Sequence, residues 1–172
     1  ADGLAVAGTA MTVDGRQQAF RWTAASGLIA LGFLPGGTFS TAAAISADGA
    51  TVLGNGDSTS PAIPMGLFRW RPETGAVRLD PPAGAFACSG AGISGDGTVV
   101  AGTCLVVNNE AFRWVGSAAP IGLGQFGGGS NQTSSAAAIS KDGGTIVGSG
   151  HPVLTGAVRW NAGGQATVIG KP

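Results

Sequence analysis

Four arginines recur at regular intervals along the sequence, and they are its clearest candidates for ligand binding. Each one precedes a tryptophan, and successive Arg-Trp pairs begin 48, 44 and 46 residues apart, at Arg21, Arg69, Arg113 and Arg159. Two roles are open to such a series. The guanidinium groups could form a ring that binds an anionic ligand such as an acidic glycan. Alternatively, each could use its five N–H donors to hold neighbouring repeats together.

His151 is the single histidine, and its imidazole could act as a general base. Glycines precede it and a proline follows it, so we expect it in a loop between two strands. The spacing of residues shows no Ser-His-Asp arrangement and no Gly-x-Ser-x-Gly elbow. We therefore predict no catalytic residue and no cofactor, and His151 and the four arginines remain the candidate binding residues.

The two cysteines are spaced for a disulfide within one hairpin. If a turn is centred on Asp96, residues whose numbers add up to 192 lie opposite each other, as Cys88 and Cys104 do. A cross-strand disulfide implies an oxidising compartment, whereas the alternative is two buried thiols. A metal site is not expected, because no second cysteine pair or histidine cluster completes one.

An Asp-Gly pair marks a second periodic series. Its aspartates are spaced 46, 48 and 46 residues apart, at Asp2, Asp48, Asp96 and Asp142. We interpret each pair as part of a three-residue hairpin loop, such as 95–97, with the glycine in the left-handed region. The aspartates are thus predicted to be turn formers, with a ligand or catalytic role as the alternative.

Each repeat contains four short runs that have the composition of β-strands. One such set of four runs is 89–94, 98–102, 111–115 and 120–124, bounded by Gly, Pro, Asn or Asp. An all-β fold follows: a β-propeller, or a fragment of one, built from four-stranded blades with a period of about 46 residues. The Ala-rich first run fits an innermost strand, and the tryptophans fit the space between blades. A β-solenoid with two coils per repeat is the alternative.

We predict a single repeat domain over residues 1–172. Counted by Asp-Gly, its repeats are 1–46, 47–94, 95–140 and 141–172, and the first lacks its first strand. This leaves an apolar strand edge at 4–8, and unpaired edges promote aggregation. We expect another copy, or the rest of a longer parent chain, to cover that edge.

The repeat resembles the HAF family of bacterial extracellular repeats. The resemblance spans the chain and is best at Ala19–Trp22, Leu31–Gly37 and Ala43–Gly54. It implies a propeller in a secreted or cell-surface bacterial protein, in some cases an autotransporter passenger, without a defined activity. The histidine of the family's His-Ala-Phe motif is absent, so its role does not carry over. Its place is taken by Gln18, Gly66, Glu110 and Gly156.

Composition narrows the function further. Nine basic and nine acidic residues give zero net charge, which argues against nucleic-acid binding, and no apolar run is long enough for a transmembrane helix. We predict an extracellular binding or adhesion scaffold without catalysis, with a carbohydrate or protein ligand. The alternative is a secreted propeller enzyme, similar to a polysaccharide lyase or glycosidase, with its active site on central loops. That alternative needs a His, a Tyr or paired carboxylates near the axis, and the chain has one His and no Tyr.

Overall fold

The computed structural model describes residues 3–61, 64–126, 132–151 and 156–170, which form β-strands and turns without a helix. The strands group into four antiparallel units, which we call blades 1 to 4. Blade 1 contains β1 (Ala5–Met11), β2 (Gln17–Thr23) and β3 (Gly27–Ala30). Blade 2 contains β4 (Ser40–Ile45), β5 (Val52–Asp57), β6 (Met65–Arg71) and β7 (Gly75–Arg78). Blade 3 contains β8 (Ala87–Ile93), β9 (Val99–Leu105), β10 (Asn109–Val115) and β11 (Ile121–Gly122). Blade 4 contains β12 (Thr133–Ile139), β13 (Thr145–His151), β14 (Gly156–Asn161) and β15 (Ala166–Gly170).

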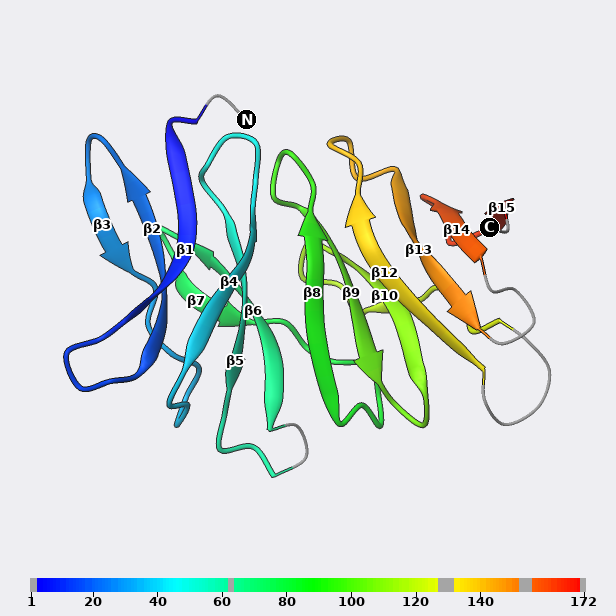
Figure 1. The fold of residues 1–172 in the computed structure, drawn as a ribbon, viewed down its shortest axis with the longest axis horizontal. Helices are drawn as coiled ribbons and strands as arrows, with labels where there is room; N and C mark the ends of the chain where they lie inside the picture. Colours follow the sequence, from blue (N-terminus) through cyan, green and yellow to red (C-terminus); the bar gives the residue numbers. More distant parts are fainter. Residues whose placement is uncertain (1–2, 62–63, 127–131, 152–155, 171–172) are drawn as a thin grey trace.

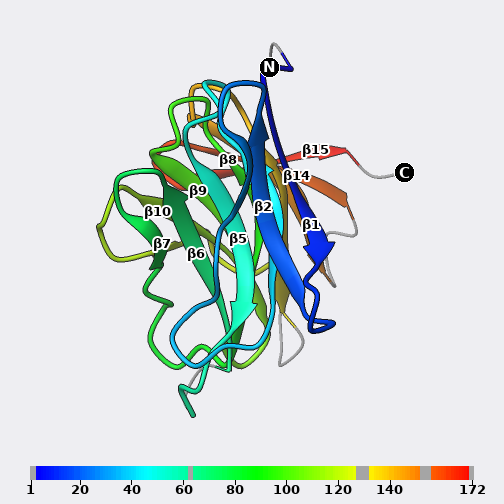
Figure 2. The same cartoon turned by 90° about the vertical axis from the view of Figure 1, so that its left-hand side faces the viewer.

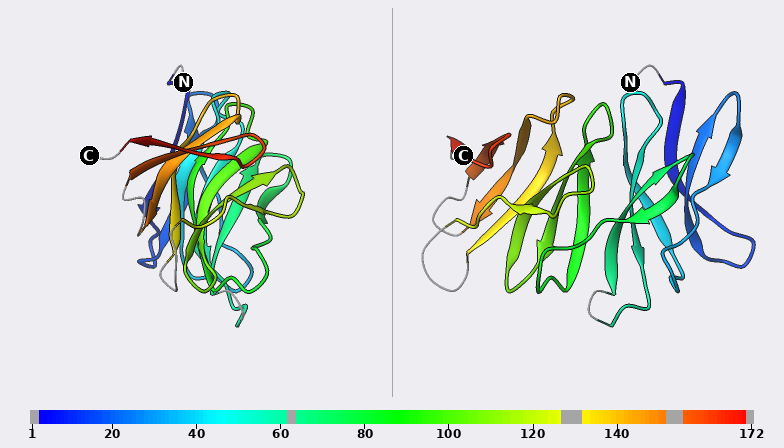
Figure 3. Two further views of the ribbon diagram at one scale, coloured as in Figure 1. Left: turned by 90° about the vertical axis from the view of Figure 1, so that its right-hand side faces the viewer. Right: turned by 180° about the vertical axis from the view of Figure 1, so that it is seen from behind.

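The blades stand side by side in chain order along the long axis of the molecule (Figures 1 and 3). Within each blade, consecutive strands pair antiparallel as a meander. A single parallel bridge, between Met65 and Ala87, joins blade 2 to blade 3. Strands β4, β8 and β12 pack next to one another across the blades. This is the arrangement of stacked blades, whereas solenoid coils would pair in parallel with the coils above and below.

The Asp-Gly pairs lie in the hairpin between the first and second strands of a blade. These hairpins lie along one side of the molecule, uppermost in Figure 1. A boundary drawn at Asp-Gly therefore falls inside a sheet, and the complete sheets span 40–78, 87–122 and 133–170. Blade 1 has three strands in the described part of the chain.

The Asp-Gly hairpin has a four-residue loop and not the expected three-residue loop. In blade 3 the Ser94 amide donates to the Val99 carbonyl at 2.8 Å, so residues 95–98 form the loop. Side chains account for the extra residue. The Ser94 hydroxyl accepts from the Val99 amide and donates to Asp96, whose carboxylate also accepts from the Thr98 amide.

The left-handed glycine predicted for this hairpin is confirmed in all three complete blades. The φ angles are 68° at Gly49, 70° at Gly97 and 71° at Gly143. A residue with a Cβ strains in this region, which explains why glycine follows each aspartate. These glycines are also buried, because each loop packs against the preceding blade.

The apolar core is divided between the three interfaces of successive blades. Each interface receives the tryptophan of the following blade, so Trp70, Trp114 and Trp160 are at most 6% exposed. They belong to the same core clusters as apolar residues of the preceding sheet, Trp70 with Ala19 and Trp160 with Ala111. Small residues at these positions let the backbones approach closely, which suits a chain with 32 glycines.

Candidate functional site

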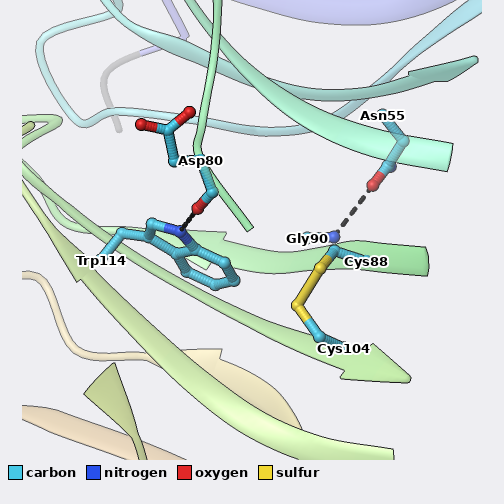
Figure 4. The surroundings of a disulfide bond; sticks show 6 residues. All are labelled: Asn55, Asp80, Cys88, Gly90, Cys104 and Trp114. Atoms are coloured by element: carbon cyan, nitrogen blue, oxygen red, sulfur yellow. Dashed lines mark hydrogen bonds between the residues drawn. A yellow bond between two sulfur atoms is a disulfide. The ribbon is translucent and has the colours of Figure 1, made fainter. Parts of the chain in front are cut away.

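The predicted disulfide is confirmed within blade 3. Cys88 on β8 lies directly opposite Cys104 on β9, and their sulfurs are bonded with a Cα–Cα distance of 4.1 Å. Figure 4 shows the bond joining the two strands, with the Gly90 amide nearby donating to the Asn55 side chain of blade 2. Both cysteines are buried. A disulfide in this position is compatible with an extracellular or cell-envelope location.

The repeated arginines lie on β2, β6, β10 and β14, and two of them bond to the following blade, as the bridging alternative predicts. Arg21 donates to the Gly49 carbonyl at 2.6 Å, and Arg113 donates to the Gly143 carbonyl at 2.6 Å. Both acceptors are the left-handed glycines of the following blade. Arg159, on the last described blade, reaches only Thr145 of its own blade.

Arg69 departs from this pattern at the interface of blades 2 and 3. The Gly97 carbonyl, which corresponds to the acceptors of Arg21 and Arg113, accepts instead from Arg71 at 3.3 Å. Arg69 donates instead to the Gly116 carbonyl, and its buried Nε has no hydrogen-bond partner among the described residues. Neither Arg69 nor Arg71 forms an ion pair with a described carboxylate. Burial and the charge of Arg71 lower the pKa of Arg69.

A cavity of about 470 Å³ lies beside these two arginines. Its lining combines Arg69 and Arg71 with the apolar side chains of Val77 and Leu79 and with Trp114 of blade 3. Arg78, which donates to the Ser58 hydroxyl, is a third arginine of the lining. The Trp114 indole N–H donates to the Asp80 carbonyl at 2.8 Å, which ties the two blades together beside the cavity. Here two arginine side chains that form no ion pair with a described carboxylate meet a concave surface.

Arg71 is a residue of this site that the sequence analysis missed. The repeat contains a signal for it: the residue after each tryptophan is Thr23, Arg71, Val115 or Asn161. A charged residue occurs at that position in one repeat alone. Comparing repeats for where they differ, and not only for where they agree, would have found it.

The turn aspartates are held in place by their own hairpins. Each carboxylate accepts from a serine hydroxyl two residues earlier and from a backbone amide two residues later, at Asp48, Asp96 and Asp142. The serine hydroxyl is the main cause that lowers the pKa of each, to about 2 for Asp96. Such groups are ionised at neutral pH and cannot donate a proton. Asp2 lies outside the described residues.

His151 is the last residue of β13 and not a loop residue. It pairs with Thr133 on β12 and is exposed. It does not line either of the cavities found beside Arg69 or beside the Asp-Gly hairpins. Among the described residues, no three His, Cys, Asp or Glu side chains lie close enough to share a metal ion, and no helix could cross a membrane.

Blade 1 presents an open face. Val6, Trp22 and Leu28 are aligned across β1, β2 and β3 and are all exposed, with Trp22 40% exposed. In blades 2 to 4 the equivalent tryptophan is covered by the preceding blade. Figure 2 views the molecule from this end, with β1 and β2 in front. The predicted edge at 4–8 lies on β1, which pairs with β2 on one side only among the described strands.

Solved structures show which known fold this arrangement resembles. TolB from Acinetobacter baumannii is 15% identical, with a TM-score of 0.64 over 99% of this chain and 41% of its own. A putative TolB from Agrobacterium tumefaciens is 14% identical, with a TM-score of 0.67 over 97% of this chain and 61% of its own. A prolyl endopeptidase structure is 12% identical, with a TM-score of 0.61 over the whole chain and 30% of its own.

These neighbours establish an all-β fold of the propeller type, and the chain spans less than two thirds of their length. The four sheets do not close into a ring in the described residues. No protein-family model and no curated protein matches the chain.

Proposed function

We propose that this chain is a propeller segment of a secreted or cell-surface bacterial protein of the HAF repeat kind, and that it serves as a binding and adhesion scaffold without catalysis. Its ligand is a carbohydrate or a protein. The main observation behind this proposal is that the repeated aspartates and two of the repeated arginines make hydrogen bonds that hold the fold together. The turn aspartates are engaged by their own hairpins, and Arg21 and Arg113 hold the following blade.

The disulfide supports the location, because such bonds persist in oxidising compartments. The enzyme alternative requires two carboxylates, or a histidine and a carboxylate, that face a common cavity. Asp80 is the single carboxylate along the cavity beside Arg69, and His151 lies elsewhere. The cavity beside the Asp-Gly hairpins is lined by Asp48, Asp96 and Asp142. Their pKa values are lowered, so these carboxylates are ionised at neutral pH and do not serve as a general acid.

The open face of blade 1 supports a further part of the proposal. We propose that a blade of the same repeat covers Val6, Trp22 and Leu28, supplied by another copy or by the rest of a longer parent chain. The support is internal repetition. The equivalent faces of blades 2 to 4 are all covered in this way, and the far side of blade 4 exposes Arg159, the counterpart of the arginines that bridge to a following blade.

A paired assay on the same polysaccharides tests the function. Labelled protein is applied to immobilised acidic and neutral polysaccharides and to cell-surface proteins, and retention is measured. Release of reducing ends and of unsaturated products is measured in parallel. Retention on at least one surface without product release is expected. Product release that depends on protein concentration would establish the enzyme alternative, and no retention on any surface would contradict the scaffold.

A further inference from the structure

We propose that the cavity between blades 2 and 3 binds an acidic sugar, with Arg69 and Arg71 as the groups that contact its oxyanion. The oxyanion is a carboxylate or a sulfate carried by the glycan. This inference rests on the proposed binding function and names the ligand class and the residues that recognise it.

The interface between blades 2 and 3 has two bridging arginines, whereas each of the other interfaces has one. Arg21 alone bridges blades 1 and 2 through Gly49, and Arg113 alone bridges blades 3 and 4 through Gly143. Between blades 2 and 3, Arg71 takes over this bridge through Gly97. Arg69 bridges to blade 3 at a different acceptor, the Gly116 carbonyl, which places it beside the cavity.

Arg69 lacks a negative partner among the described residues, whereas the charge of Arg71 acts on Asp48 and lowers its pKa. Neither guanidinium forms an ion pair with a described carboxylate, and the Arg69 Nε is buried without an acceptor among the described residues. Burying an unpartnered donor of a charged group costs stability. The lowered pKa of Arg69 has the same origin, since burial and the neighbouring Arg71 both disfavour its charged form. An oxyanion in the cavity would supply the missing negative charge beside Arg69.

The cavity matches an acidic sugar in charge, in apolar surface and in volume. Guanidinium groups bind carboxylate and sulfate oxygens through two parallel hydrogen bonds. Val77 and Leu79 provide an apolar wall for the carbon face of a sugar ring, and the Gly116–Ala118 turn forms part of the lining. A volume of about 470 Å³ falls within the range of small-molecule sites.

Asp80 is the one carboxylate among the described residues that line the cavity, and its negative charge disfavours binding of an anion. Its backbone carbonyl accepts from the Trp114 indole, whereas its side-chain carboxylate is exposed and points away from that indole (Figure 4). It forms no ion pair with Arg69 or Arg71. Removing its charge therefore changes the electrostatics of the cavity without removing the bond that holds Trp114.

Calorimetric titration of the whole chain with three tetrasaccharides tests the proposal. The probes are an oligogalacturonate, a sulfated galactan and a neutral galactan. Binding of at least one charged probe is expected, and which one binds identifies the source of the oxyanion. Arg71→Met should weaken that binding roughly tenfold or more, as for loss of a hydrogen bond to a charged group. Arg159→Met, which alters an exposed arginine far from the cavity, should leave it unchanged.

Asp80→Asn removes a negative charge from the cavity, whereas Arg71→Met removes a positive one. Because Asp80 is exposed, this variant tests the proposal even if Arg71→Met does not fold. It should tighten binding of the charged probe by roughly twofold to fivefold at low salt. The proposal is overturned if neither charged probe binds, if the neutral probe binds equally well, or if neither variant changes the affinity. Tetrasaccharide binding without polysaccharide retention would keep the site and reject the adhesion function. Polysaccharide retention that is unchanged in Arg71→Met would support the adhesion function and reject this site.

Discussion

Cys88 and Cys104 face each other because two irregularities of the β8–β9 hairpin cancel. Its four-residue loop pairs Ile93 with Val100, which shifts the register by one residue from a three-residue loop. A β-bulge at Ala91 then absorbs one residue of β8, so Gly90 pairs with Gly102 and Cys88 with Cys104. The same bulge occurs between Ala42 and Ala44 in blade 2 and between Ala136 and Ala138 in blade 4.

The bulge also connects the blades. Just before it, the Ala42 amide donates to Thr9 of blade 1, and the Gly90 amide donates to Asn55 of blade 2. The Ala136 amide donates to Thr103 of blade 3 in the same manner. A bulge leaves a residue out of the ladder. In every complete blade, the residue just before the one left out donates to a side chain of the preceding blade, so the bulge and the contact between blades occur together.

The disulfide should make a large contribution to stability. The cysteines are 16 residues apart, and in the chain-entropy model a loop of that size corresponds to about 3 kcal/mol. Replacing both cysteines by alanine should therefore lower the free energy of unfolding by roughly 2–4 kcal/mol in urea denaturation. The matched measurement is mass spectrometry of an unreduced digest, which should contain the cross-linked peptide. Rapid alkylation of both thiols in the native protein would contradict it.

Gly97 should tolerate alanine less well than Gly75, although both have positive φ. At Gly97 a Cβ would meet both left-handed strain and the Thr51 side chain of the preceding blade, so Gly97→Ala should cost roughly 2–4 kcal/mol. At Gly75 a Cβ meets open space, so Gly75→Ala should cost only about 1–2 kcal/mol. Thermal and urea unfolding measure both. Equal effects would show that the hairpin does not pack tightly on the neighbouring blade.

The Asp-Gly hairpins should make stability depend on pH in the acid range. Hydrogen bonds from Ser94 and Thr98 lower the pKa of Asp96 from 3.8 to about 2. A lowered pKa in the folded state means that the stabilisation is fully present above the unfolded value and is lost as the pH falls toward about 2. Asp48 and Asp142 shift in the same direction.

Urea unfolding measured at several pH values should therefore show constant stability above the unfolded pKa and a decline below it. Asp96→Asn should make that decline shallower, because asparagine does not titrate. Glu73→Gln is the control, since this exposed side chain belongs to no hairpin of this kind and should leave the profile unchanged. A profile that is flat in the acid range would contradict the proposed hydrogen bonds.

The two terminal tryptophans should differ in their contribution to stability. Trp160 is fully buried and donates its indole N–H to the Leu123 carbonyl of blade 3, so Trp160→Ala should cost about 3–5 kcal/mol. Trp22 is 40% exposed on the open face, so Trp22→Ala should cost less than about 2 kcal/mol for a single unassociated chain. Unfolding at several protein concentrations measures both. A Trp22→Ala effect that grows with concentration is expected if another copy covers blade 1.

The sequence by itself determined the features that arise within a few residues or within one hairpin. The Asp-Gly period predicts the left-handed glycines, because a residue's own backbone sterics set that preference wherever the hairpin lies. The four strand-like runs per repeat predict the antiparallel meander for the same local reason. The spacing of the cysteines also predicts their pairing correctly. That prediction assumes a three-residue loop without a bulge, and the longer loop and the bulge shift the register in opposite directions. Both depend on hydrogen bonds of serine and aspartate side chains and on the neighbouring blade.

Tertiary structure alone decided what the repeated residues contact. Of four arginines that are equivalent in sequence, Arg21 and Arg113 bond to equivalent glycine carbonyls of the following blade. The other two have different acceptors, because Arg71 occupies the equivalent carbonyl at one interface and no described blade follows blade 4. Four equivalent tryptophans range from buried to 40% exposed according to whether a blade precedes them. The cavity beside Arg69 arises in the same way. Side chains more than 40 residues apart create it when blades 2 and 3 pack, and no local pattern of residues specifies how closely they will approach.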